Sequence, residues 1–283
     1  QTIGTDTVPL LTTEAAKQVY GVKFSYNGEV KAMRYANKGG HVVPPTVQEL
    51  LGADYAPNIT YALSFEGDFS ASSTVTGNTT VVANVVFKDI SIATKADWRK
   101  FCDRVNRGET TLNAKMTADV DLGEDTWQVG ASRNYSGTFD GQGHTLTVNW
   151  NSAFSFPLAP FAVVENATIK NLHVKGQITN RGNLSGLMIN ASGTTTVSGC
   201  VIEVNLKSSN DVTGMINWTQ PNSQVTITDC VVKGALNSDA TNTMAGFVYQ
   251  MWGDCTFNNC LYLGTNNATE GCTFGWTHNI TNC

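Results

Sequence analysis

Four carboxylates fall close together in the run DVDLGED: Asp119, Asp121, Glu124 and Asp125. Oxygen-rich loops of this kind can hold calcium. The position of the glycine and the missing distal glutamate break the EF-hand pattern, and an alternating strand is the competing interpretation. We expect no metal site, with calcium at these residues as the alternative. We also expect no cofactor, because GQGHT (141–145) lacks the flanking strand and helix of a dinucleotide site.

Aromatic residues form a second group that can carry function. Trp218, Tyr249, Trp252 and Trp276 follow a small residue and an apolar pair in successive segments of the C-terminal half. Rings aligned on one side of a protein can stack on sugar rings or anchor a protein partner. The alternative is that they cover polar loops or fill the interior. A ligand-binding aromatic face is therefore a hypothesis that depends on which side of each strand they occupy.

The distribution of acids and bases does not predict catalysis. Cleavage of a polysaccharide needs a pair of carboxylates, or an acidic metal cluster beside a proton acceptor. From residue 151 onward the charged residues are scattered over predicted loops, and the four histidines share no ligand spacing with one another or with the cysteines. We expect that the chain is not an enzyme.

The strands that must position these residues belong to an internal repeat. This repeat lies beyond Pro160 and has a period of about 23 to 30 residues. The phrases TIKNLHV, TVSGCVI, TITDCVV, TFNNCLY and NITNC recur, each after a small residue, an apolar pair and a polar loop. Their alignment gives two columns. One column contains Leu172, Cys200, Cys230, Cys260 and Cys283, and the column before it contains Asn171, Gly199, Asp229, Asn259 and Asn282.

Such a unit cannot bury its apolar side alone, whereas stacked copies with parallel strands bury a continuous core. We therefore predict a right-handed parallel β-helix, with the cysteine column facing inward and the Asn/Asp column at a corner. Free packed thiols are the expected state of the column, because in-register neighbours point alongside one another and strain a bridge. A disulfide ladder is the alternative, and a bridge between Cys255 and Cys272 stays open.

Residues 94–108 predict a helix, because Trp98, Phe101, Cys102 and Val105 form one apolar stripe. Thr94 is placed to cap its start. An open β-helix end would expose strand edges, so we expect this helix to cover that end. Residues 20–90 lack the repeat and read as hairpins around Asn-Gly and Gly-Asn turns. The expected organisation is a segment 1–19, a module 20–90 and the capped β-helix 91–283, a mainly all-β chain.

Two family resemblances follow from these motifs. The run from Trp98 through YSGTFDGQGHTLTV and the later repeats resembles bacterial surface proteins with GLUG-type repeats. The pattern VKFSYNG, GGHVVPP and VTGNTTVVANVVF in 20–88 resembles the internalin B-repeat type of small β-grasp module, without its usual tryptophan. These resemblances imply an adhesin or scaffold that binds protein or glycan on a cell surface. A carbohydrate-binding or polysaccharide-degrading protein is the alternative.

Composition and charge limit the classes of partner that we expect. The net charge is −5 with no basic run, so nucleic acid is not an expected partner. No apolar run reaches the length of a membrane span. Only 14% of residues are charged, and the abundance of Thr, Asn, Ser and Gly is typical of an extracellular β protein. We expect a secreted or cell-surface location with a signal peptide removed, and a natural chain that continues past Cys283 or packs there against another molecule. The oligomeric state is open.

Overall fold

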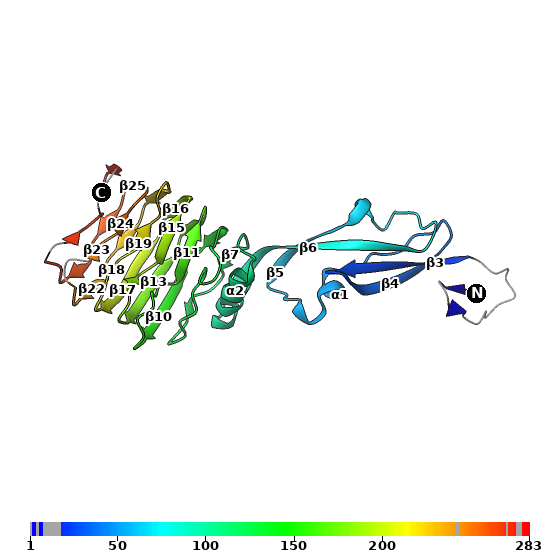
Figure 1. Cartoon of the computed structure of the whole chain (residues 1–283), viewed down its shortest axis with the longest axis horizontal. Helices are drawn as coiled ribbons and strands as arrows, with labels where there is room; N and C mark the ends of the chain where they lie inside the picture. Colours follow the sequence, from blue (N-terminus) through cyan, green and yellow to red (C-terminus); the bar gives the residue numbers. More distant parts are fainter. Residues whose placement is uncertain (1, 4–5, 8–17, 241–243, 270, 276–278) are drawn as a thin grey trace. The chain divides into compact units, whose positions relative to one another are not determined.

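The chain forms two compact units in the computed structural model, Gln1–Lys88 and Asp89–Cys283. The structure describes residues 2–3, 6–7, 18–240, 244–269, 271–275 and 279–283. Strands account for 49% and helices for 9%, with a β-solenoid of about 6 turns. Figure 1 shows the solenoid strands stacked from β7 (Asn113–Met116) to β25 (Asp254–Asn258). The prediction of a mainly β chain containing a parallel β-helix is confirmed.

The first unit is a mixed sheet with the strand order β4-β3-β6-β5. β3 and β4 form an antiparallel hairpin whose turn residues Asn27 and Gly28 have φ of 50° and 82°, as an Asn-Gly turn favours. β6 runs parallel to β3, which gives the expected β-grasp-like arrangement. Its elements are β1 (Thr2–Ile3), β2 (Asp6–Thr7), β3 (Val19–Tyr26), β4 (Glu29–Asn37), α1 (Val47–Leu51), 3-10 helices at Gly52–Asp54 and Glu66–Asp68, β5 (Ile59–Phe65) and β6 (Thr79–Ile92).

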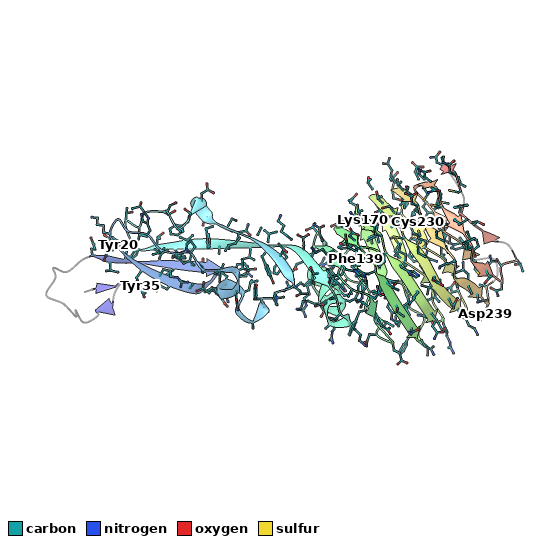
Figure 2. All side chains as sticks on the ribbon, turned by 180° about the vertical axis from the view of Figure 1, so that it is seen from behind. Tyr20, Tyr35, Phe139, Lys170, Cys230 and Asp239 are labelled. Atoms are coloured by element: carbon teal, nitrogen blue, oxygen red, sulfur yellow. The ribbon has the colours of Figure 1, made fainter. Side chains whose placement is uncertain are left out.

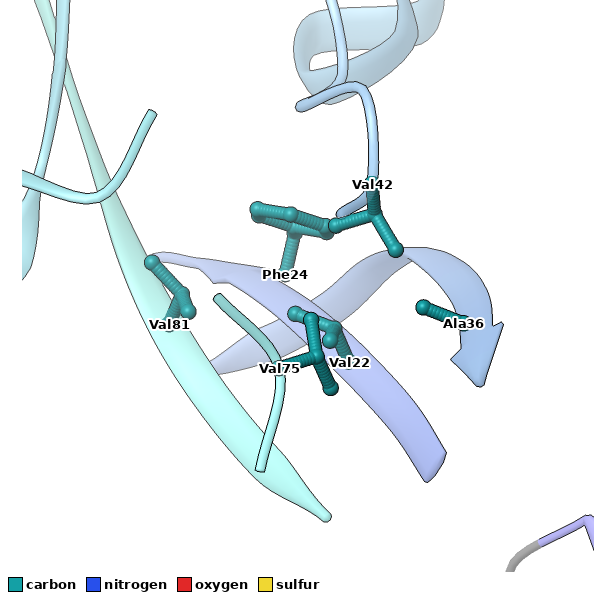
Figure 3. Packing of buried hydrophobic residues seen from close by; sticks show 6 residues of the cluster. All are labelled: Val22, Phe24, Ala36, Val42, Val75 and Val81. Atoms are coloured by element: carbon teal, nitrogen blue, oxygen red, sulfur yellow. The ribbon is translucent and has the colours of Figure 1, made fainter. Parts of the chain in front are cut away.

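Two apolar clusters hold this unit together. β3 and β6 turn alternate side chains to the same side of the sheet, where loop residues cover them. Figure 3 shows the first cluster, in which Phe24 lies among small aliphatic side chains. Its members are Val22, Phe24, Ala36, Val42, Val75 and Val81. The second cluster comprises Leu50 and Leu51 of α1 with Ala83 and Val85 of β6.

Helix α1 is a helix that our sequence analysis did not predict. Thr46 accepts a hydrogen bond from the Glu49 backbone N–H at 3.2 Å, and the Glu49 carboxylate accepts one from the Thr46 N–H at 2.8 Å. This is a capping box. The sequence signal was present as Thr-x-x-Glu before an apolar pair, but the helix is only one turn and a half long.

The second unit has four parallel sheets that run along the solenoid. Sheet 1 contains β7, β9 (Thr138–Asp140), β12 (Thr168–Lys170), β16 (Thr194–Ser198), β20 (Gln224–Thr228), β25 and β29 (Asn279–Thr281). Sheet 2 contains β8 (Val120–Asp121), β10 (Thr145–Asn151), β13 (His173–Thr179), β17 (Val201–Ser208), β21 (Val231–Val232), β22 (Ala235–Ser238), β26 (Leu261–Tyr262) and β27 (Thr265–Asn266). Sheet 3 contains β11 (Phe161–Glu165), β15 (Met188–Ser192), β19 (Ile216–Thr219) and β24 (Val248–Met251). Sheet 4 contains β14 (Leu184–Ser185), β18 (Val212–Thr213), β23 (Met244–Ala245) and β28 (Gly271–Cys272).

The register of sheet 1 reproduces the sequence repeat. Thr168 pairs with Thr196, Thr196 with Thr226, Thr226 with Thr256 and Thr256 with Asn279. These pairs are 28, 30, 30 and 23 residues apart. Each repeat is therefore one turn of the solenoid, and its residues meet their counterparts one strand spacing away, about 4.8 Å.

The glycine that opens each repeat has a packing reason. A Cβ at Gly186 would lie 2.3 Å from the carbonyl oxygen of Gly214, and a Cβ at Gly214 would lie 2.1 Å from that of Gly246. At Gly246 the corresponding distance to the Thr273 carbonyl oxygen is 2.6 Å. The backbones of consecutive turns approach too closely here for any side chain, so the small residue is a requirement of stacking.

Helix α2 (Lys95–Arg107) covers the first turns, as predicted. Thr94 and Asp97 form a capping box at its start, and Gly108 ends it with φ 122°. Trp98 packs edge-on against Phe139 and Phe161, with ring centroids 5.8 and 6.0 Å apart. These rings and those of Phe101 and Tyr135 are buried at the α2 end of the core, where Figure 2 labels Phe139.

The segment between the module and α2 is a strand. Asp89–Ile92, the last four residues of β6, pair in parallel with Asn113–Met116 of β7. Ile90 and Ile92 are buried. Asp89–Ile92 therefore extend sheet 1 by one strand, and Ile90 and Ile92 alternate with polar residues as in the later turns.

Candidate binding surface

The cysteine column lies inside the solenoid. The backbone N–H of Val201 donates to Leu172, that of Val231 to Cys200 and that of Leu261 to Cys230, each at 2.9 Å, so these residues occupy the same place in consecutive turns. Cys200, Cys230 and Cys260 are free and buried. Cys283 follows at the next turn, where its sulfur accepts the Cys260 N–H at 3.3 Å, and it is exposed.

The remaining described cysteines are also free. Cys255 lies on β25 opposite Val225 and is buried, so the alternative of a Cys255–Cys272 bridge does not hold, although the Cys272 side chain lies outside the described residues. Burial raises the pKa of Cys255 to about 12 and that of Cys260 to about 12. Thiols with such pKa values are protonated and inert at neutral pH. Cys200, Cys230 and Cys260 are almost completely buried, so the column fills space in the core.

The Asn/Asp column makes the corner between sheets 1 and 2. All five of its residues have left-handed backbone conformations, with φ between 52° and 61°. They are Asn171, Gly199, Asp229, Asn259 and Asn282. Asparagine, aspartate and glycine are the residues that tolerate this conformation. The side chains also link turns, because the Asn259 amide donates to Asp229 at 2.5 Å.

The structure does not bring the predicted aromatic residues into one row. Trp218 on β19 is half-buried, and its register partners are Asn190 and Gln250 rather than aromatic residues. Tyr249 is half-buried and precedes Gln250, so it occupies another column. Trp252 lies between β24 and β25 and is 63% exposed. Trp276 lies outside the described residues. Among the described members of the predicted aromatic group, Trp252 is the most exposed.

The four carboxylates of 119–125 also separate. Asp119 accepts the Thr145 backbone N–H at 2.8 Å and lies 3.3 Å from His144 Nδ1. Asp121 accepts the Gly123 N–H at 2.8 Å, and Asp125 pairs with Lys95. Glu124 stands between them in the turn after β8. No group of three or more His, Cys, Asp or Glu side chains is arranged to hold a metal ion within the part of the chain that the structure describes.

Two neighbouring hollows lie along the corner at the first turns, and we name them together the corner groove. The hollows have volumes of 540 and 310 Å³ and share Gln142. The residues that line it are Asp89, Asn113, Ala114, Lys115, Thr138, Asp140, Gln142, Gly143, Lys170, Asn171, Leu172, His173, Gly199 and Val201.

Asp140 is the central group of the corner groove. Its carboxylate accepts the Gln142 backbone N–H at 3.0 Å, the Gln142 amide at 2.7 Å and the Asn171 amide at 3.1 Å, and Lys170 lies at 3.2 Å. Burial alone would raise the pKa of Asp140, but these donors outweigh it and lower the pKa below its ordinary value. The charged form of Asp140 is therefore favoured, and its hydrogen bonds link consecutive turns at the corner.

Next to the groove, the outer face of sheet 2 carries an ion-pair group. His173 Nε2 lies 3.0 Å from Glu203 Oε2, and Lys233 Nζ lies at the same distance from that oxygen. The hydrogen bond from Lys233 is the main cause of the lowered pKa of Glu203, and the hydrogen bond with His173 lowers this pKa further. The three residues come from consecutive turns, so stacking assembles them.

The sequence analysis missed Asp140 and Lys170, although a signal existed. GTFDG (137–141) is the same phrase as TIKN and TVSG one and two turns later, which places Asp140 beside Lys170. The repeat is regular only beyond Pro160, so GTFDG stands apart from it in the sequence.

Comparison of the chain with family models, with curated proteins and with solved structures finds no match. Among the described helices, none combines the length and the apolar character needed to cross a membrane.

Proposed function

We propose that this chain is a non-catalytic binding module, an adhesin or scaffold that works secreted or at a bacterial cell surface. The observation that carries the proposal is the pairing of charged groups on the outer faces of the solenoid. Asp140 is satisfied by Gln142, Asn171 and Lys170, and Glu203 by His173 and Lys233. The donors that satisfy each carboxylate favour its charged form, which suits a rigid recognition surface better than proton transfer.

The resemblance to surface proteins with GLUG-type repeats and to internalin B-repeat modules supports the same proposal. Stacked turns present regular columns of polar side chains over an extended face, and repeat proteins use such faces to bind partners. The partner we propose is a protein or glycan on a cell surface. Neither nucleic acid nor a cofactor enters the proposal.

A specific observation favours carbohydrate as the ligand in a second candidate function. Trp252 exposes 63% of its surface at a turn between two strands, a position from which the ring can stack on a sugar. The corner groove adds amide, ammonium and imidazole groups that suit sugar hydroxyls. Polysaccharide cleavage is less well supported, because the donors around Asp140 favour its charged form and do not suit a general acid.

The test is binding of the labelled full chain to intact cells before and after protease or periodate treatment. The proposal expects saturable binding that one of the two treatments removes, and no new reducing ends when polysaccharides are incubated with the protein. Turnover of any polysaccharide would contradict it. For the carbohydrate candidate, Trp252→Ala should lose glycan binding, whereas Phe154→Ala, which removes a ring that is 72% exposed between β10 and β11, should retain it.

A further inference from the structure

Two tryptophans lie on neighbouring turns of sheet 3, where β15, β19 and β24 run side by side (Figure 1). Trp218 on β19 is the register partner of Gln250 on β24. Two residues further along the same two turns come Gln220 and Trp252, respectively. The tryptophans therefore stand diagonally rather than in one row, with a glutamine at each of the other two corners. We name these four residues the sheet-3 group.

The side chains of the sheet-3 group lie on the outer surface of the solenoid. Trp252 is exposed, and the other three members, Trp218, Gln220 and Gln250, are half-buried. Ile216, which faces the interior two residues before Trp218, is completely buried. Trp218 has a further turn on each side of it, so its partial exposure places the indole ring on the outside.

The polar atoms of the sheet-3 group have no partner in the protein. Within the described ranges, neither indole N–H donates a hydrogen bond, and neither glutamine side chain donates or accepts one. Asn190 extends the group by one turn, because it is the register partner of Trp218 on β15. Asn190 is only 8% exposed, and its Oδ1 is buried without a hydrogen-bond donor. Buried polar atoms are normally satisfied, so this oxygen points to a ligand group as its partner.

The chemistry of these residues fits an uncharged sugar. Sugar rings stack on indole rings through their C–H faces, and a hydroxyl group both donates and accepts hydrogen bonds. One hydroxyl can therefore serve an amide oxygen and an indole N–H at the same time. Neither the sheet-3 group nor Asn190 carries a charge, so these residues offer nothing that selects an acidic sugar or a phosphate.

We propose that the sheet-3 group, together with Asn190, binds a neutral glycan. This inference rests on the proposed function in its carbohydrate form, and it assigns to that function a place, a set of residues and an uncharged class of ligand. The corner groove is a different site, because it lies between sheets 1 and 2 and contains the charged pair Asp140 and Lys170.

The test is affinity electrophoresis of the purified full chain in gels that each contain one polysaccharide. Mannan, galactan, xylan and laminarin are the neutral probes, and alginate and polygalacturonate are the acidic probes. The variants are Trp218→Ala, Trp252→Ala and Gln250→Ala. The matched control is Phe154→Ala, which removes an exposed ring outside the group. Circular dichroism and the melting temperature show whether each variant is folded.

We expect at least one neutral probe to retard the wild type and Phe154→Ala equally. Trp252→Ala should raise the dissociation constant about tenfold, because it removes a stacking ring. Gln250→Ala should raise it about fivefold, the size of one lost hydrogen bond. These two variants decide the test if Trp218→Ala does not fold, because the side chains that they remove lie at the surface.

Absence of retardation by every neutral probe overturns the inference, as does full affinity of folded Trp252→Ala or Gln250→Ala. Retardation by alginate or polygalacturonate alone also overturns it, because the group contains no cation. The proposed function is judged separately by saturable binding to intact cells. Cell binding that protease removes, without binding to any neutral probe, refutes this site and leaves the proposed function standing.

Discussion

Gly214→Ala tests the close stacking of consecutive turns, because it adds a single methyl group between two of them. The added methyl group would lie 2.1 Å from the Gly246 carbonyl oxygen and 2.5 Å from Val232 Cγ1. The carbonyl oxygen of Gly246 belongs to the backbone of the adjacent turn. That turn is also hydrogen-bonded to Gly214, whose N–H donates to the Ala245 carbonyl oxygen at 3.0 Å. The clash can be relieved only by separating turns that hydrogen bonds hold together.

The expected loss follows from that geometry. Overpacking of a well-packed core costs about 1–3 kcal/mol, and the clash with backbone places Gly214→Ala at the upper end, about 3 kcal/mol. With a urea m-value of about 2–3 kcal/mol/M, the midpoint should fall by about 1 M or more. Thr194→Ala, at an exposed position of β16, is the control and should stay within about 0.5 kcal/mol of the wild type.

Tryptophan fluorescence is a suitable assay, because all six tryptophans lie in the second unit. Urea unfolding followed at this signal reports the solenoid without contribution from the first unit. A Gly214→Ala protein whose midpoint equals that of Thr194→Ala would refute the reasoning, since the opening glycines would then have no role in the spacing of turns.

Three further predictions follow from the same geometry. In the native protein at pH 8, Cys283 should react with iodoacetamide while Cys200, Cys230 and Cys260 stay protected until urea is added, as peptide mass spectrometry would show; equal labelling would contradict the buried column. Thr94→Ala should destabilise the solenoid by about 1 kcal/mol, because it removes the helix cap, and a chemical melt that leaves the midpoint unchanged would argue against this role. The lowered pKa of Asp140 contributes stability that is present above the unfolded pKa of about 3.9 and is lost as pH falls through the folded value. The stability difference between wild type and Asp140→Asn should therefore shrink below about pH 4, and a difference that stays constant from pH 7 to pH 3 would refute the assignment.

The architecture was predictable because each turn of a solenoid repeats the same packing problem. Cysteine at 200, 230 and 260 recurs because each occupies the same buried place, and Asn171, Asp229 and Asn259 recur because the corner requires positive φ. Each requirement is local to one turn, so a single sequence shows it as a residue type that recurs once in every repeat. The helix α2 was predictable for the same reason, since its apolar stripe and capping residues are local.

The candidate site was less predictable, because it depends on which side of a strand a residue occupies. Trp218 and Tyr249 follow similar openings, yet they fall in different columns of sheet 3. Asp140 and Lys170 are far apart in sequence and meet only through the register of β9 and β12.

The measurement that tests the central claim most directly is the position of the sulfur atoms, located by anomalous scattering from a crystal of the full chain. Figure 2 labels Cys230, the middle member of the column. Stacked turns predict that the sulfurs of Cys200, Cys230 and Cys260 lie in one line, with neighbours about 5 Å apart, one strand spacing. Sulfur positions that are scattered, or separated by more than two such spacings, would contradict the solenoid and every surface proposed on it.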